Sequence, residues 1–155
     1  MKVVVFSDSH GRKELVDRML SKEPDCKEVV FLGDGMKDIE WVTEFYPEKK
    51  FTCVKGNNDW YFNVNKEAYK YFDGVTVFAC HGDLYNVRTT LSEIYKKAHS
   101  VNAGLALYGH THVAKQTKDY STGVTALNPG ALCDGKYCVI EFSKGSFTVE
   151  QKSCY

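Results

Sequence analysis

Residues 2–11, KVVVFSDSHG, decide how this chain is expected to fold. The apolar run Val3–Phe6 is short and predicts a buried strand. The polar loop Asp8–Gly11 follows at once and carries a carboxylate, an imidazole and a glycine. The apolar run is far shorter than a signal-peptide core or the ~20 residues of a membrane span. We therefore expect a cytoplasmic protein with no membrane partner.

The composition limits the remaining possibilities. The chain has 155 residues, which suits one compact domain, and we expect a single domain over residues 1–155. Its apolar share of 43% is enough to build a core, so disorder is not expected. Twenty basic residues balance twenty acidic ones. A protein that holds extended nucleic acid usually has a basic excess, so we expect no such partner.

The pattern outward from the first strand changes between the two halves of the chain. The first half alternates predicted strands at residues 2–7, 29–32 and 51–54 with predicted helices at residues 12–22 and 37–46. The second half has one predicted helix, at residues 88–101, among predicted strands at residues 68–72, 75–80, 105–108, 115–120, 122–127, 137–142 and 146–150. Asp73-Gly74 and Lys144-Gly145 are expected to turn hairpins. This order predicts an α/β protein with two packed sheets and helices outside.

Five of these strands are followed by Asp, Asn or His with a glycine beside it. In chain order the segments are Asp8-Ser9-His10-Gly11, Gly33-Asp34-Gly35, Gly56-Asn57-Asn58-Asp59, His81-Gly82-Asp83 and Gly109-His110-Thr111-His112. Sites in open α/β sheets form at the carboxyl ends of strands, and glycine lets the backbone approach a ligand closely. We therefore expect these five segments to build one site.

The donors in these segments are carboxylate, amide and imidazole groups, without thiolate. Such a set suits Mn, Fe, Zn, Ni or Co. Seven ligands exceed what one ion takes from a protein, whereas two ions about 3.5–4 Å apart that share a carboxylate would use them all. Taken alone, an Asp after a strand is more often a cap, and a lone histidine such as His99 is more often structural. The ordered set favours a metal site.

The order Asp8-x-His10, Gly33-Asp34, Gly56-Asn57, His81 and Gly109-His110-x-His112 resembles the calcineurin-like metallophosphoesterase superfamily over residues 1 to about 130. The short chain is similar to the small bacterial and archaeal phosphodiesterases of that superfamily, whose fold Vps29 shares. The resemblance implies a four-layer αββα sandwich of two mixed β-sheets flanked by helices. It also implies that Asp8, His10 and His112 bind a first metal, that Asp34 bridges, and that Asn57, His81 and His110 bind a second.

The resemblance further implies a binuclear phosphodiesterase that hydrolyses a small phosphate ester by attack of a metal-bridging hydroxide. Its cofactors would be two divalent transition metal ions, with Mn preferred in vitro and Ni, Co, Fe or Zn as alternatives. Asn57 and His81 would serve catalysis as ligands. Asn58 stands where many relatives have a His or Cys that assists the leaving group, and we expect no proton donation from its amide. Asn128-Pro129-Gly130 resembles a loop near the site, although Ala131 stands where the family often has Ser.

Two alternatives to this enzyme remain open. The first is a Vps29-like binding scaffold with residual or no activity, although all seven ligand positions hold competent residues. The second is a nuclease on short oligonucleotides, in which the aromatic run Trp60–Phe62 would stack on a base. Such a run more often packs in a core or loop. The sequence leaves open the physiological substrate, the native metal and whether the chain forms a homo-oligomer.

The chain has six cysteines, at positions 26, 53, 80, 133, 138 and 154. None has C-x-x-C spacing, so a zinc knuckle or a thioredoxin-type site is not expected. Cys53 and Cys80 lie inside apolar strand-like runs, where free cysteine behaves as a small hydrophobe. We expect reduced structural thiols rather than disulfides.

Overall fold

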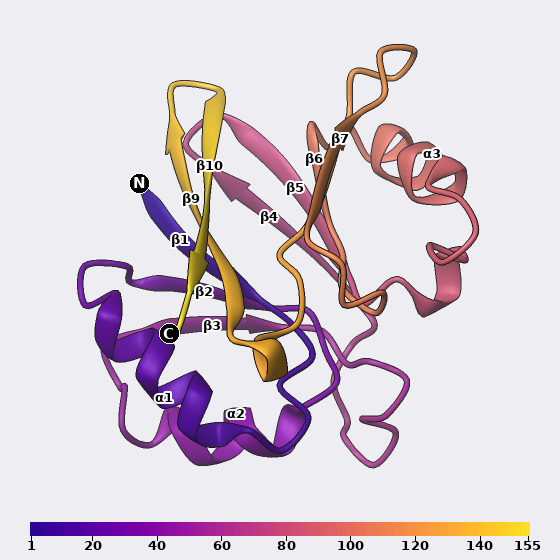
Figure 1. Ribbon diagram of the computed structural model, residues 1–155. Helices are drawn as coiled ribbons and strands as arrows, with labels where there is room; N and C mark the ends of the chain where they lie inside the picture. The colour runs from indigo at the N-terminus through magenta and orange to yellow at the C-terminus, as the bar shows by residue number, and fades with distance from the viewer.

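The computed structural model describes residues 1–155 and has two five-stranded sheets packed face to face (Figure 1). The first sheet has the order β10-β9-β1-β2-β3. Its strands are β1 (Lys2–Phe6), β2 (Glu28–Phe31), β3 (Lys50–Cys53), β9 (Lys136–Ser143) and β10 (Ser146–Ser153). β1, β2 and β3 are parallel, β9 is antiparallel to β1, and β10 is antiparallel to β9, so the sheet is mixed.

The second sheet has the order β4-β5-β6-β8-β7. Its strands are β4 (Glu67–Phe72), β5 (Val75–Cys80), β6 (Leu105–Leu107), β7 (Lys115–Lys118) and β8 (Thr125–Asn128). β5, β6 and β8 are parallel, whereas the edge strands β4 and β7 are antiparallel to their neighbours. The carboxyl ends of β5 and β6 therefore lie at the same edge of this sheet.

Helices cover both outer faces of the pair of sheets. α1 (Lys13–Lys22) and α2 (Met36–Thr43) pack outside the first sheet, and α3 (Ser92–Ser100) packs outside the second (Figure 1). The alternation along β1 explains the layers. Val4 and Phe6 pack toward α1 and α2, whereas Val3 and Val5 pack between the sheets. The predicted four-layer αββα sandwich of two mixed sheets is confirmed.

Two helices are shorter than the sequence predicts. α2 ends at Thr43 rather than 46, because Pro47 disfavours helical geometry at the residue before it. α3 begins at Ser92 rather than 88, since residues 86–91 form a turn in which Asn86 has a left-handed φ of 51°. Both predictions placed the helix correctly and misjudged one end.

Several predicted strand boundaries in the second half also shift, most of all those of β8 and β10. β8 starts at Thr125 rather than 122, because the Asp119 side chain accepts hydrogen bonds from Ser121 and Thr122 and holds these residues in a turn. β10 continues to Ser153, three residues beyond its predicted end. It pairs with β9 along its whole length.

Both predicted hairpin turns are confirmed, and they touch. Asp73-Gly74 joins β4 to β5 with φ values of 42° and 94°, and Lys144-Gly145 joins β9 to β10 with φ values of 48° and 82°. The Gly145 N–H donates to the Asp73 carbonyl at 2.8 Å. This contact ties the two sheets together at the end opposite the carboxyl ends of β1 and β5.

All six cysteines are free, as predicted, and four of them are buried. No helix of the chain has the length and apolar character needed to cross a membrane.

Candidate metal centre

Six of the seven predicted ligands lie in one cluster at the carboxyl ends of β1, β2, β5 and β6. The six are Asp8, His10, Asp34, His81, His110 and His112. They come from four separate loops, and the parallel strands of each sheet bring those loops to one edge. The order of strand ends seen in the sequence thus becomes one site in space.

The first group within the cluster contains Asp8, His10 and His112, whose donor atoms all lie within 4.8 Å of one another. Asp8 Oδ1 is 3.2 Å from His112 Nε2 and 3.6 Å from His10 Nε2. The two histidine Nε2 atoms are 3.2 Å apart. Three donor atoms that converge on one point in this way are better placed to bind one shared cation than to interact with one another.

The second group contains Asp34, His81 and His110. Asp34 Oδ2 is 3.4 Å from His81 Nε2, which is 3.2 Å from His110 Nδ1. The groups adjoin, because Asp8 Oδ1 is 4.0 Å from His81 Nε2 and Asp34 Oδ2 is 3.9 Å from His10 Nε2. Both carboxylates therefore lie between the two histidine pairs.

The surroundings of one oxygen atom indicate whether these residues fit a metal ion. Asp8 Oδ1 is buried and has no hydrogen-bond partner in the protein. The other oxygen of that carboxylate accepts the His110 N–H at 3.1 Å. Leaving a buried carboxylate oxygen unpaired is costly, and a cation among the surrounding imidazoles would remove that cost. The donor set and this unpaired oxygen fit a divalent ion.

His81 is held in the orientation that a metal ligand needs. Its Nδ1 lies 2.7 Å from the Leu32 carbonyl oxygen and donates to it, which leaves Nε2 pointing at Asp34. Burial lowers the His81 pKa, but the hydrogen bond and charge of Asp34 outweigh it and raise the pKa above its usual value. Burial raises the Asp34 pKa, but hydrogen bonds from His81 and Asn58 outweigh it and keep the pKa well below its usual range.

The backbone of the site is strained where its ligands are. Five of the six clustered residues have φ in the left-handed region, namely Asp8 (55°), His10 (44°), Asp34 (63°), His110 (68°) and His112 (62°). Asp and His tolerate this region better than bulkier residues, at about 1–3 kcal/mol each. Gly56 has to be a glycine, because a Cβ there would lie 2.0 Å from Asp34 Oδ1. Strain of this kind gathers at functional sites.

In the loop after β3, Asn58 rather than Asn57 hydrogen-bonds to the cluster. The backbone N–H of Asn58 donates to Asp34 Oδ1 at 2.8 Å, and its side-chain amide donates to Asp34 Oδ2 at 2.7 Å. The Asn57 side chain is exposed and makes no hydrogen bond. The role of Asn57 as a metal ligand therefore stays a prediction.

Two buried carboxylates brace the ligand loops, and the sequence analysis assigned neither this role. Asp59 accepts hydrogen bonds from four backbone N–H groups of the Asp34 and Gly56 loops. Asp38 Oδ2 accepts the Ser9 hydroxyl at 2.6 Å and the Gly11 N–H at 3.0 Å. The position of Asp59 within the Gly56–Asp59 motif was a usable signal, whereas Asp38 lies inside α2 without any motif.

Asn128 braces the loop that carries His110 and His112. Its side-chain amide donates to the Gly109 carbonyl at 2.9 Å and to the Thr111 hydroxyl at 3.0 Å. Its Oδ1 accepts the Gly130 N–H at 2.9 Å. The Asn128–Gly130 segment thus lies beside the cluster, where the resemblance placed it.

Arg88 is the one cationic side chain that hydrogen-bonds to the cluster. Its Nε donates to His110 Nε2 at 3.0 Å from the loop between β5 and α3. Burial, the charge of His81 and then the charge of Arg88 lower the pKa of His110. No motif surrounds Arg88 in the sequence, so its place at the site was not predicted. A guanidinium in this place can bind phosphoryl oxygens.

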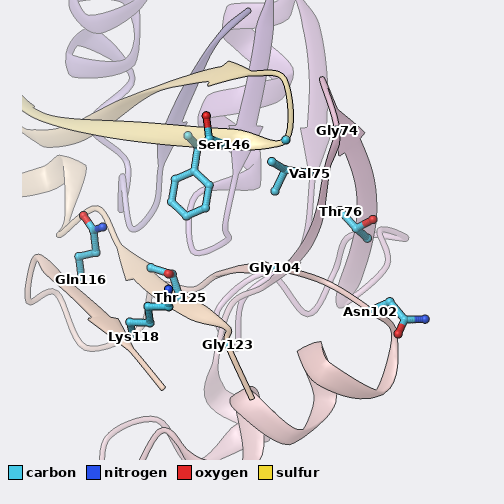
Figure 2. A pocket seen from close by; sticks show the side chains of 12 residues that line it. Gly74, Val75, Thr76, Asn102, Gly104, Gln116, Lys118, Gly123, Thr125 and Ser146 are labelled. Atoms are coloured by element: carbon cyan, nitrogen blue, oxygen red, sulfur yellow. The ribbon is translucent and has the colours of Figure 1, made fainter. Parts of the chain in front are cut away.

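A cavity of about 280 Å³ opens beside the cluster, and its lining includes Asp34, Asn58, Tyr61 and Phe62. A larger cavity of about 580 Å³ lies at the opposite end of the sheets, where β5 begins at Val75. Figure 2 shows that the labelled residues around it are glycines and mainly polar side chains. The larger cavity is thus remote from the ligand cluster.

Comparison with protein families and curated proteins agrees with this geometry. The model of the calcineurin-like phosphoesterase superfamily domain matches residues 1–145. A Bacillus subtilis (strain 168) protein described as a probable metallophosphoesterase, YsnB, is 26% identical over 132 residues. That match covers 85% of this chain and 75% of YsnB.

Solved structures share the fold at lower identity. A predicted phosphoesterase from Streptococcus pneumoniae TIGR4 has a TM-score of 0.83 and 22% identity, over 99% of this chain and 89% of its own. Zinc-bound Vps29 from Entamoeba histolytica has a TM-score of 0.76 and 16% identity, over 100% of both chains. An archaeal phosphodiesterase has a TM-score of 0.72 and 17% identity, over 98% of this chain and 100% of its own.

Proposed function

This chain belongs to the calcineurin-like phosphoesterase superfamily, and from that premise we propose that it is a phosphodiesterase with a binuclear metal centre. The family supports the broader assignment, a metal-dependent phosphoester hydrolase. The observation that carries the finer proposal is the buried Asp8 Oδ1, which has no partner and lies between two histidine pairs. A cation held beside His10 and His112 would use this oxygen.

The residues divide between two cation positions. Asp8, His10 and His112 would hold the first ion and Asn57, His81 and His110 the second, with Asp34 as the ligand predicted to serve both. When bound, such ions act as Lewis acids that lower the pKa of water and offset charge on phosphoryl oxygens. Mn is the preferred ion, with Ni, Co, Fe or Zn as alternatives.

The other side chains of the site orient the substrate and the ligands. Arg88 reaches the cluster from the His110 side and would bind a phosphoryl oxygen through its guanidinium. Asn58 holds the Asp34 carboxylate through two hydrogen bonds. Tyr61 and Phe62 line the cavity beside that carboxylate and would contact one ester substituent. The reaction itself requires no protein nucleophile, and Ser7 is occupied by the Gly130 carbonyl.

A small diester is the substrate class that the observations favour. The cavity of about 280 Å³ admits one substituent of modest size. The chain carries no net charge, which disfavours an extended nucleic acid. The archaeal neighbour of the same fold is named a phosphodiesterase. A nuclease that acts on short oligonucleotides is the second candidate, because Trp60 and Tyr61 stack on each other and are 67% and 77% exposed.

A binding scaffold is the alternative from another class, since Vps29 has the same fold and binds zinc in its solved structure. Activity separates the two functions. The test combines elemental analysis of the purified protein with a panel of phosphodiesters, phosphomonoesters and a short oligonucleotide, each assayed with Mn, Ni, Co, Zn and Mg. We expect EDTA to abolish hydrolysis and Mn to restore it best. Full hydrolysis in excess EDTA, with no metal in the protein, would contradict the proposal.

A further inference from the structure

A third group of metal-ligating side chains lies beside the cluster and brings in a sulfur atom. The donor atoms of His112, Cys133 and Asp134 all lie within 4.8 Å of one another. His112 and Cys133 are half-buried, and Asp134 is exposed. Only His112 belongs to the seven predicted ligands, so Cys133 and Asp134 are donors that the proposed function does not use.

Backbone hydrogen bonds fix the turn that carries these two residues. Cys133 and Asp134 belong to a 3₁₀ turn, Leu132–Asp134, between β8 and β9. The Cys133 N–H donates to the Asp8 carbonyl at 3.1 Å, and the Leu132 N–H donates to the Ser7 carbonyl at 2.8 Å. The turn is thereby attached to the end of β1, next to the first ligand group. The backbone position of Cys133 is therefore fixed by the fold.

The chemistry of the three donors selects a class of cation. Sulfur, imidazole nitrogen and carboxylate oxygen together suit Zn²⁺ or Co²⁺, whereas Mg²⁺ and Ca²⁺ prefer oxygen alone. Three protein ligands with one place for water is a common arrangement of a tetrahedral site. In such a site nitrogen and sulfur lie about 3.5 Å apart. Separations of up to 4.8 Å can close to that value by side-chain rotation.

We propose that His112, Cys133 and Asp134 form an outer cation position that binds zinc-like ions and competes with the inner group for His112. His112 Nε2 is 3.2 Å from Asp8 Oδ1 and so already belongs to the inner group. An ion held by Cys133 and Asp134 would draw the imidazole outward and leave Asp8 with His10 alone. Excess zinc would then inhibit the enzyme, whereas Mg²⁺ would not.

The experiment is a Co²⁺ titration of metal-free protein, followed by absorption spectroscopy. Cobalt bound to sulfur gives a charge-transfer band in the near ultraviolet, and cobalt bound only by nitrogen and oxygen does not. We expect this band in the natural protein and its loss in Cys133→Ser. Cys53→Ser is the matched control, because Cys53 is also half-buried but lies in β3, and it should keep the band. The readout is independent of hydrolysis, so it stands even if the proposed function fails.

A second variant guards against a folding defect in Cys133→Ser. Asp134 is exposed, so Asp134→Asn should fold normally. We expect it to raise the Co²⁺ concentration at half-saturation of the band about 10-fold or more. Loss of a group that only orients a ligand already lowers metal affinity by about that factor. If saturating Co²⁺ gives the natural protein no sulfur band, or if Cys133→Ser keeps it, the outer position does not exist. An unchanged half-saturation in Asp134→Asn would remove that carboxylate from the site and overturn the three-ligand proposal.

Discussion

The buried Asp59 carboxylate holds Asp34 in place, because its Oδ2 accepts the Asp34 backbone N–H at 2.7 Å. The same oxygen accepts the Gly56 N–H at 2.9 Å, and Oδ1 accepts the N–H groups of Gly35 and Met36, both at 3.0 Å. One side chain thus joins the loop after β2 to the loop after β3. All its acceptor positions are used, so Asp59 is not free to protonate a leaving group.

Removing this brace should cost stability as well as activity. Asp59→Ala leaves four inward-facing N–H groups without their acceptor, and we expect the free energy of unfolding to fall by at least about 2 kcal/mol. Asp59→Asn keeps one acceptor oxygen, so its free energy of unfolding should fall by less. Urea unfolding measures both, with Asp25→Asn as an exposed control. Equal stability of Asp59→Ala and the natural protein would mean that these hydrogen bonds contribute nothing net.

The sequence predicts the positions of the ligand loops because each follows a buried strand, and the strand pattern is visible in the chain. Six of the predicted ligands meet for that reason. Contacts within the loop after β3 could not be predicted, since whether Asn57 or Asn58 faces Asp34 depends on local turns. The closeness of Cys133 to His112 could not be predicted either, because only the packing of its turn on β1 brings the two residues together. The early end of α2 at Thr43 was foreseeable from Pro47.

The central carboxylate should matter more than a histidine outside the cluster. Asp34→Ala removes an anionic group that faces both His81 and His10, so we expect hydrolysis to fall at least about 100-fold. His99 is exposed on α3 and outside the cluster, so His99→Ala should hydrolyse the same substrate at nearly the natural rate. The measurements are the steady-state hydrolysis rates and the metal content of both variants, once each is shown to be folded. Equal losses would show that the site is wrongly assigned.

Arg88 should contribute through substrate binding. A charge-assisted hydrogen bond to a phosphoryl oxygen is worth about 1.5–3 kcal/mol, so Arg88→Ala should lower kcat/KM about 10- to 150-fold. Arg88→Lys keeps the positive charge but loses the fork of N–H donors of the guanidinium. Its kcat/KM should therefore lie between those of Arg88→Ala and the natural protein. Arg18→Ala, exposed on α1, is the control. A kcat/KM that stays unchanged in Arg88→Ala would mean that the guanidinium does not touch substrate.

Stability at acid pH should depend on Glu67, which joins β4 to the segment before α3. Burial raises the Glu67 pKa, but hydrogen bonds from Tyr69 and Tyr85 outweigh it and lower the pKa below its usual value. Because the folded pKa is depressed, the stabilisation is fully present above the unfolded pKa of about 4.3 and is lost as the pH falls through the folded pKa. Urea unfolding from pH 6 to 3 should therefore show a smaller acid loss in Glu67→Gln than in the natural protein.

The control for that measurement is Glu48→Gln, since Glu48 is exposed. It should lose stability with falling pH as the natural protein does. Identical pH profiles for Glu67→Gln and the natural protein would show that Glu67 titrates alike in the folded and unfolded chains.

The leaving group should receive little help from a proton donor. Asn58, which contacts the cluster from the loop after β3, carries an amide, and an amide cannot act as an acid at neutral pH. Two neighbours could have replaced it, but Asp59 is saturated by backbone N–H groups, and His81 donates from Nδ1 to Leu32 while Nε2 faces Asp34. General acid catalysis contributes about 10²–10⁴-fold. Esters with poor leaving groups should therefore react slowly.

The measurement is the hydrolysis rate of a series of phosphodiesters against the pKa of the leaving group. We expect a steep dependence for the natural protein, with aryl esters favoured over alkyl esters, because the departing oxygen must carry its own charge. Asn58→His should flatten the dependence by supplying a donor. Asn58→Ala is the matched control: it removes the amide hydrogen bond to Asp34 Oδ2 without adding an acid, and so should stay steep. A flat dependence in the natural protein would mean that another acid reaches the leaving oxygen, and it would contradict this account. If the natural slope is steep and only Asn58→His flattens it, the missing acid is the cause, and the physiological substrate has a leaving group good enough to depart without one.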